Sequence, residues 1–313
     1  MINPVIFSIK ITETFYLTLT WYGVLVMTGV LVAGWLAEKE MRRRGENGEH
    51  VWNALVWALP SGVIGARLWY VAQSIWSGNP YYLDDPHKIV LINEGGLHFF
   101  GALLFGGIAL VLYVRKYKLD PWLLLDSVAP MVLIGQAIAR PANFINQELY
   151  GQPTNLPWGI AIDAAHRIAP YNDLARYPLE TTRFHPTFAY EMLWNFLAAA
   201  LLIWLAHKLK SALRPGVLFA GWLILAGAGR FIIESFRPDQ PLIPGTALSY
   251  SRLFAALMAI AGAFLLLLIT DTIRLPRLNP WRETYYLAPP LPQTVSGPKS
   301  QPVKRVYRRK RRG

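Results

Sequence analysis

The chain has 313 residues, of which 53% are apolar and only 16% are charged, and its mean hydropathy is positive. Soluble domains carry about a quarter charged residues, so this composition favours a membrane protein. The absence of cysteine excludes disulfides, thiolate metal sites and any mechanism in which the protein itself supplies a thiol nucleophile. The net charge of +12 is uneven, because residues 299–313 contain eight Lys and Arg and no acid.

Seven windows are apolar over a length that can cross a bilayer core about 30 Å thick, which needs roughly 20 residues per helix. In chain order they are 17–37, 51–76, 97–114, 121–139, 188–206, 216–235 and 249–270. The sequence therefore predicts an all-α polytopic membrane protein with seven transmembrane helices.

Lys and Arg are distributed unequally between the two sets of connecting segments. The segments on one side hold 21 of them and those on the other side hold seven. The rich set is 38–50, 115–120, 207–215 and the chain from 271. Because cytoplasmic loops carry the excess of positive charge, we expect the N-terminus outside and the C-terminus in the cytoplasm.

This topology divides the chain into a membrane domain, residues 1–275, and a Pro- and Arg-rich cytoplasmic tail, residues 276–313, which we expect to be disordered. A small extracytoplasmic head is expected at about 140–187, between the fourth and fifth helices. The polybasic end of the tail is typical of segments that bind anionic lipid head groups at the cytoplasmic surface. Nucleic acid is not an expected partner.

Charged side chains at membrane depth usually face a cavity or a partner. Arg230, Glu234 and Arg237 are spaced i, i+4, i+7, which places them on one helix face. Two guanidinium groups on this face fit a phosphodiester, with the central carboxylate holding them in place. The alternative is an interhelical salt-bridge network with Asp126 or Glu191.

A second polar cluster lies at the outer end of the fourth predicted helix. Its members are Arg140, Asn143, Asn146, Glu148 and Gly151. This density of directional donors and acceptors suits an anionic, hydroxylated head group, whereas the alternative is an ordinary polar interfacial loop in which Asn and Gly serve turns.

Glu191 and His98 each stand near the start of a predicted helix. A carboxylate there also complements the helix dipole without any catalytic role, and a lone interfacial histidine also serves structure. Both are therefore candidate site residues with a structural alternative.

These motifs together resemble the prolipoprotein diacylglyceryl transferase family of bacteria. The matching stretches follow the family's order along the chain: Trp21–Gly23, Gly65–Val71, Glu94–Leu97, Ala139–Gly151, His185–Glu191 and Arg230–Arg237. The family also has seven spans with the N-terminus outside, in agreement with the charge distribution.

The resemblance implies transfer of a diacylglyceryl group from phosphatidylglycerol to the lipobox cysteine in the signal peptide of a preprolipoprotein, which releases glycerol phosphate. Because the nucleophilic sulfur belongs to the substrate, a cysteine-free enzyme fits this chemistry. The implied site residues divide into three roles. Arg140 and Arg230 stabilise the phosphate, Asn143, Asn146, Glu148, Gly151 and Arg237 form the head-group site, and Tyr22, Glu191 and Glu234 hold the arginines or assist removal of the thiol proton. No metal or organic cofactor is expected.

The chain departs from the family pattern at the start of the third predicted helix. The family usually has a histidine, often assigned as the base, where this chain has Phe100, and His98 stands two residues earlier. This leaves open a family member that has lost catalysis and binds phosphatidylglycerol. A transporter or channel would show a continuous file of charges or an inverted repeat, and neither is present in the sequence.

Overall fold

The computed structural model describes residues 2–11, 16–91, 95–209 and 212–273. Seven helices in this part are long and apolar enough to cross a membrane. They are α1 (Trp21–Arg43), α2 (Glu49–Trp76), α4 (Phe99–Tyr117), α5 (Pro121–Ala139) with its short continuation α6 (Pro141–Ile145), α7 (Thr187–Leu209), α8 (Val217–Glu234) and α9 (Tyr250–Ile269). The prediction of seven spanning helices is confirmed.

The start of the first helix was predicted wrongly. Residues 17–20 belong to strand β2 (Tyr16–Thr20), which pairs antiparallel with β1 (Val5–Lys10). Helix α1 begins at Trp21 because the Thr20 side chain caps it, its Oγ1 accepting a hydrogen bond from Gly23 N at 3.2 Å. Hydropathy alone does not separate this apolar strand from the apolar helix that follows it.

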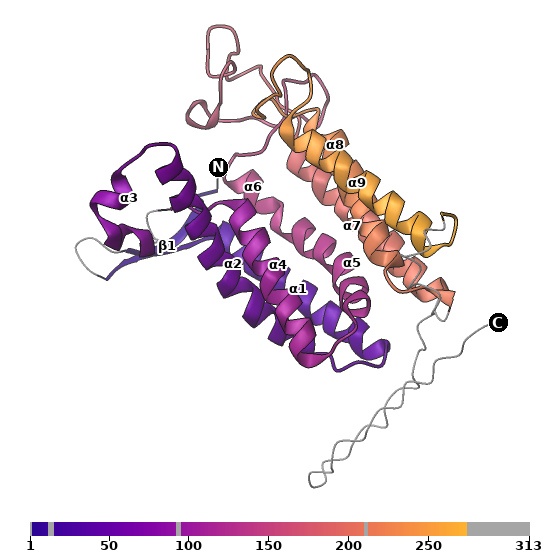
Figure 1. Ribbon diagram of the computed structural model, residues 1–313. Coiled ribbons are helices and arrows are strands. Elements are labelled where there is room, and N and C mark those ends of the chain that lie inside the picture. Colours follow the sequence, from indigo (N-terminus) through magenta and orange to yellow (C-terminus); the bar gives the residue numbers. More distant parts are fainter. Residues whose placement is uncertain (1, 12–15, 92–94, 210–211, 274–313) are drawn as a thin grey trace, which may run out of the picture.

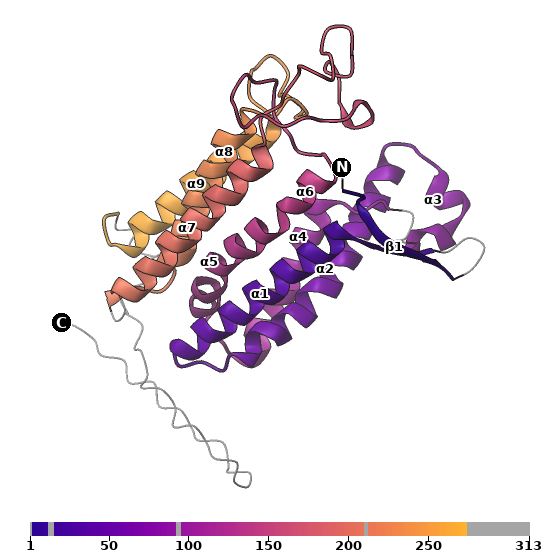
Figure 2. The same ribbon diagram turned by 180° about the vertical axis from the view of Figure 1, so that it is seen from behind.

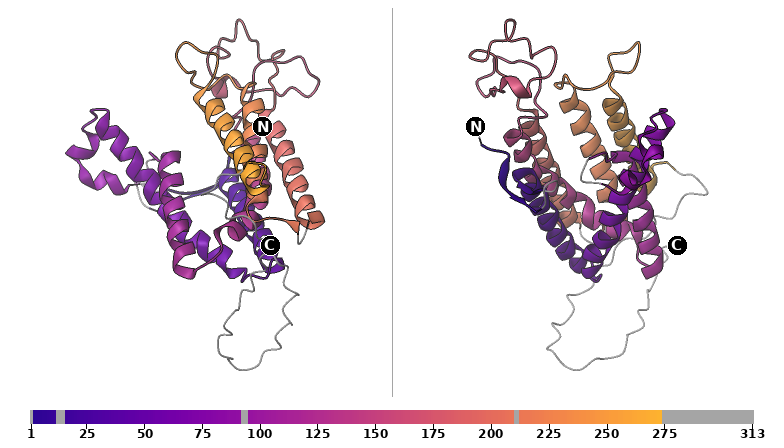
Figure 3. Two further views of the ribbon diagram at one scale, coloured as in Figure 1. Left: turned by 45° about the vertical axis from the view of Figure 1, so that its right-hand side comes forward. Right: turned by 90° about the vertical axis from the view of Figure 1, so that its left-hand side faces the viewer.

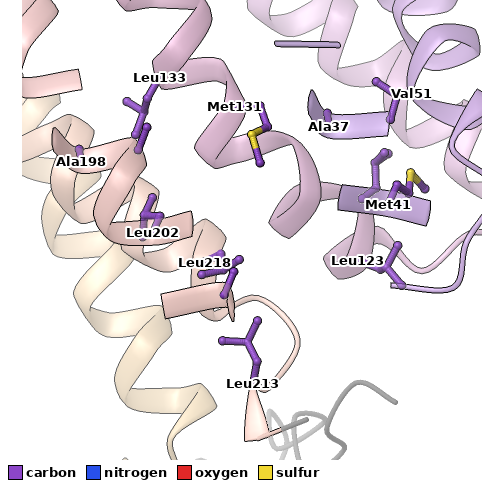
Figure 4. Packing of buried hydrophobic residues seen from close by; sticks show 13 residues of the cluster. Ala37, Met41, Val51, Leu123, Met131, Leu133, Ala198, Leu202, Leu213 and Leu218 are labelled. Carbon is purple, nitrogen blue, oxygen red and sulfur yellow. The ribbon is translucent and has the colours of Figure 1, made fainter. Parts of the chain in front are cut away.

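The spanning helices form two groups joined by α5 (Figures 1 and 2). Helices α1, α2 and α4 lie on one side of α5, and α7, α8 and α9 lie on the other; α5 packs against α1 in the first group and against α7 and α8 in the second. In the buried core, Leu123 of α5 lies near Met41 of α1, while Leu133 lies near Ala198 and Leu202 of α7 (Figure 4).

Glycines allow α2 and α4 to approach closely. A Cβ atom on Gly101 would collide with the carbonyl oxygen of Gly65, and the reverse substitution would place a Cβ 2.6 Å from the carbonyl oxygen of Gly101. Small residues at such contacts are the usual means by which helices pack in membranes.

We therefore expect Gly101→Ala to lower the free energy of unfolding by about 1–3 kcal/mol, because the backbone contact must open. Gly107→Ala in the same helix is the matched control, since a Cβ there meets nothing within 4 Å. Apparent melting temperatures of the two purified variants in detergent check this. Equal melting temperatures would show that the α2–α4 contact yields without cost.

Asp126 is fully buried on α5 and caps the N-terminus of α8. Its Oδ2 accepts a hydrogen bond from Gly216 N and its Oδ1 accepts one from Phe219 N, each at 2.8 Å. Asp126 thus lies at the opposite end of α8 from Arg230, and of the two partners considered from sequence it is Glu191 that pairs with Arg230. Its role is to satisfy backbone donors at a helix start.

Among the irregular regions that project from the end of the bundle where α1 begins (Figure 3), two contain short helices in the described part of the chain. The first contains α3 (Tyr81–Asp84) and the 3-10 helix η1 (Pro86–Val90), and buried Arg67 of α2 holds it by donating hydrogen bonds to backbone carbonyls. Its acceptors are the carbonyl oxygens of Lys88, Ile89, Gly95 and Gly96. The second runs from α6 to α7, contains η3 (Ala164–His166) and has a small core around Tyr150, Ile162 and Phe184.

Candidate functional site

An ion-pair junction joins three helices at the end of the bundle below the α6–α7 segment. Arg140 stands at the C-terminus of α5, Glu191 in the second turn of α7 and Arg230 near the end of α8. Arg140 Nη2 donates to Glu191 Oε1, and Arg230 Nη1 lies 3.9 Å from Glu191 Oε2. One carboxylate therefore bridges two arginines that are 90 residues apart in the chain.

The junction continues along α8. Arg230 Nε lies 2.9 Å from Glu234 Oε2, and Arg237 Nη1 lies 3.7 Å from the same oxygen. The Glu234 side chain is 1% exposed, so these two arginines supply its charge compensation. The face predicted from the i, i+4, i+7 spacing is therefore present, with the carboxylate between the guanidinium groups.

Arg237 has a partner that sequence reasoning missed. Its Nη2 and Nε donate to the two carboxylate oxygens of Asp239 at 2.7 and 3.1 Å. Burial alone would raise the pKa of Asp239, but the hydrogen bond and the charge of Arg237 outweigh it and hold that pKa below its usual value. Arg237 is only 6% exposed, and its ion-pair partners in the described part of the chain are Glu234 and Asp239, not the Asp126 or Glu191 considered in the alternative.

The side chains of Arg140 and Arg230 are more accessible to solvent than that of Arg237, because they are 19% and 34% exposed. Among the described residues, Nη2 of Arg230 donates no hydrogen bond. The Nε atom of Arg140 is buried and has no hydrogen-bond partner in the same part of the chain. The junction thus holds two arginines in place, and Arg230 still has an N–H group from which a ligand oxygen can accept a hydrogen bond.

The polar cluster after α5 is connected to Arg140 by hydrogen bonds. Arg140 Nη1 donates to Asn143 Oδ1 at 3.2 Å, and Asn143 Nδ2 donates to Glu148 Oε1 at 2.9 Å. Asn146 Nδ2 donates to the same oxygen at 3.2 Å. Two amides therefore orient one carboxylate, whose half-buried position leaves its second oxygen available.

Gly151 follows this cluster at a position where only a residue without a side chain fits. A Cβ atom there would lie 2.8 Å from His185 Cβ and 2.9 Å from the carbonyl oxygen of Phe236, and the Gly151 N–H donates to His185 O at 2.8 Å. The glycine allows the segment after α6 to pass between the chain ends that precede α7 and follow α8.

Burial lowers the pKa of His185, whose Nδ1 lies 3.0 Å from Tyr190 Oη.

The structure does not bring His98 into the junction. His98 is the N-cap of α4, its Nδ1 accepting from Phe100 N at 3.4 Å, and its ring stacks on Trp69 at a centroid distance of 6.1 Å. In the described part of the chain it makes no hydrogen bond or ion pair with Arg140, Glu191 or Arg230. Tyr22 lies in the first turn of α1 and is exposed.

An apolar cavity of about 340 Å³ lies between α1, α2, α4 and α5. Its lining includes Gly29, Gly34 and Gly135, and it reaches Gln136 and Ala139 in the last turn of α5. The cavity therefore extends to Ala139, which directly precedes Arg140 in the chain.

Among the described residues, His, Asp and Glu side chains form no group of three or more that could hold a metal ion.

Comparison with known proteins gives one consistent result. Residues 4–268 match the family described as prolipoprotein diacylglyceryl transferase. The chain is 40% identical over 227 residues to the phosphatidylglycerol–prolipoprotein diacylglyceryl transferase of Chloroflexus aggregans, covering 70% of this chain and 73% of that protein. It is 37% identical over 250 residues to the protein of the same name from Symbiobacterium thermophilum (80% and 88% covered) and 34% identical over 242 residues to that from Enterococcus faecalis (77% and 83% covered).

Proposed function

The chain belongs to the prolipoprotein diacylglyceryl transferase family and is a diacylglyceryl transferase, and we propose that it transfers the diacylglyceryl group of phosphatidylglycerol to the lipobox cysteine thiol of preprolipoproteins. This is the first step of bacterial lipoprotein maturation. The names of the relatives support these substrates. We place the protein in the bacterial plasma membrane with its N-terminus outside, an orientation supported by the Lys and Arg distribution.

The observation that carries the proposal is the Arg140–Glu191–Arg230 junction. In the reaction, the substrate sulfur forms a bond to the glyceryl carbon that carries the phosphate, and the carbon–oxygen bond breaks with its electron pair passing to the phosphate oxygen. Negative charge therefore grows on the leaving glycerol phosphate. Arg140 and Arg230, held by Glu191, are the groups that we assign to stabilise this charge.

The rest of the site binds the lipid. Glu148, oriented by Asn143 and Asn146, accepts hydrogen bonds from the glycerol hydroxyl groups. The apolar cavity that ends at Ala139 takes part of an acyl chain, since its lining is almost wholly aliphatic. Glu234 and Arg237 keep Arg230 in place, and Tyr22 lines the approach from α1.

Removal of the proton from the substrate thiol needs less assistance from the enzyme than stabilisation of the leaving phosphate does. A thiol with a reference pKa near 8.5 is already a few per cent thiolate at neutral pH. We therefore assign the main part of the catalytic effect to charge stabilisation. His98 caps α4, so His98→Ala is expected to retain transfer, and a complete loss in a folded His98→Ala variant would assign the proton to it.

The proposal is tested by measuring transfer of labelled lipid from phosphatidylglycerol to a lipobox peptide by the purified protein. The control peptide carries serine in place of the cysteine, and phosphatidylcholine replaces phosphatidylglycerol in a second control. Thiol-dependent transfer from phosphatidylglycerol alone is the expected result. Binding of phosphatidylglycerol without any transfer would identify a family member that has lost catalysis.

The cytoplasmic tail is assigned to membrane contact, not to catalysis. The proposed tail, residues 276–313, lies outside the described residues. Deletion of residues 299–313 is expected to leave transfer unchanged, because its eight cations belong to the side opposite the proposed site. The same transfer assay checks this, and complete loss of activity in the truncated protein would contradict the assignment.

A further inference from the structure

The β1–β2 hairpin has two chemically different faces. Directly paired residues of an antiparallel ribbon point to the same side, and successive residues alternate. The pairs Phe7–Leu19 and Ile9–Leu17 therefore form one wholly apolar face. The pairs Ser8–Thr18 and Lys10–Tyr16 form the other face, where the Ser8 and Thr18 hydroxyl groups lie 2.9 Å apart.

The apolar face is not covered by the described part of the protein. The side chains of Phe7, Ile9, Leu17 and Leu19 are all exposed. A two-stranded ribbon is marginal in water by itself and needs an apolar surface against one face. A contiguous exposed patch of this kind indicates an interaction with a membrane or a protein.

The position of the hairpin favours the membrane over a protein as the partner of its apolar face. Trp21 N donates to Pro4 O at 3.0 Å, which ties the start of β1 to the start of α1, and the strands then leave sideways across the direction of the helices (Figures 1 and 2). Exposed Trp21 and Tyr22 lie at this junction, as is usual for aromatic residues at a membrane–water interface. Further along α1, Met27 and Leu31 are also exposed apolar residues.

We propose that the hairpin is an interfacial membrane element, with its Phe7–Ile9–Leu17–Leu19 face against the acyl chains of the leaflet beside the N-terminus of α1. The face with Ser8, Thr18 and Lys10 is turned to the head groups and water, so Lys10 lies where anionic head groups are found. This arrangement adds a contact parallel to the membrane plane to the seven spans. It is independent of the reaction that the enzyme catalyses.

The cysteine-free chain allows a direct test, because any introduced cysteine is the only labelling site. Single nitroxide labels are placed on the apolar face (Phe7→Cys, Leu17→Cys) and on the polar face (Ser8→Cys, Thr18→Cys) of the full-length protein in nanodiscs that contain phosphatidylglycerol. Trp35→Cys on the exposed side of α1 serves as the bilayer reference, and Ala175→Cys in the α6–α7 segment serves as the aqueous reference.

Collision of each label with oxygen, which enriches in lipid, and with a water-soluble nickel chelate gives its position. We expect the Phe7 and Leu17 labels to resemble the bilayer reference and the Ser8 and Thr18 labels to resemble the aqueous one, with several-fold differences in the ratio of the two collision rates. Aqueous values on both faces would overturn the proposal. Shielding of the apolar face from both reagents would also overturn it and would indicate a protein partner. Two labels per face keep the test valid if one variant fails to fold.

Discussion

Replacing Arg140 with alanine is expected to lower kcat/KM for diacylglyceryl transfer by about 100-fold or more, the size of effect seen when one preorganised donor to a developing oxyanion is removed. Arg140 binds both Glu191 and Asn143, so its loss removes one of the two arginines that we assign to the phosphate and also releases the carboxylate that aligns Arg230. Arg140→Lys is expected to recover only part of the activity, because an ammonium group keeps the charge but cannot bind two partners with a planar fork.

The matched control is Arg176→Ala, which removes an exposed arginine from the α6–α7 segment on the same side of the bundle. Its transfer rate should equal that of the wild type, which would exclude a general effect of surface charge on the attraction of anionic lipid. Initial rates over a range of phosphatidylglycerol concentrations, at fixed peptide, give kcat/KM for each variant. Retention of more than a small fraction of activity by Arg140→Ala would remove Arg140 from the reacting site.

The seven spanning helices could be predicted because length and hydropathy are local properties of the chain. Their boundaries were less predictable. The error at residues 17–20 arose because a short apolar strand and an apolar helix have the same hydropathy, whereas the Thr20 cap that separates them depends on side-chain geometry. Asp126 was identified as a charge at membrane depth, but its role as cap of α8 depends on a contact between residues 90 positions apart.

Most residues of the candidate site could be predicted from the sequence, but most of the contacts between them could not. The i, i+4, i+7 spacing correctly placed Glu234 between Arg230 and Arg237. Spacing in the sequence could not show that Arg140, Glu191 and Arg230 meet, because three different helices contribute them. Their proximity was expected only through the family resemblance. Asp239 carried no motif, and the apolar cavity depends on how several helices pack around glycines.

The second large effect is expected at Arg230, where structure and chemistry can be separated. Arg230→Ala leaves the buried Glu234 carboxylate with Arg237 at 3.7 Å as its remaining ion-pair partner among the described residues. A buried charge left without any partner costs about 3–5 kcal/mol of stability. Because Arg237 remains beside Glu234, the cost here should be smaller than that, and the variant should both unfold more easily and lose transfer. Taken alone, a loss of activity in Arg230→Ala would therefore not distinguish a catalytic arginine from a structural one.

The double variant Arg230→Ala, Glu234→Gln resolves the two roles. Glutamine has nearly the shape of glutamate but no charge, so the buried site no longer needs the arginine and the melting temperature should return most of the way to that of the wild type. Transfer should remain about 100-fold lower, because no group then replaces the Arg230 guanidinium at the leaving phosphate. Glu234→Gln alone is the control for any effect of the amide on activity. Recovery of transfer together with stability in the double variant would show that Arg230 acts by holding the fold, and the phosphate would then depend on Arg140 alone.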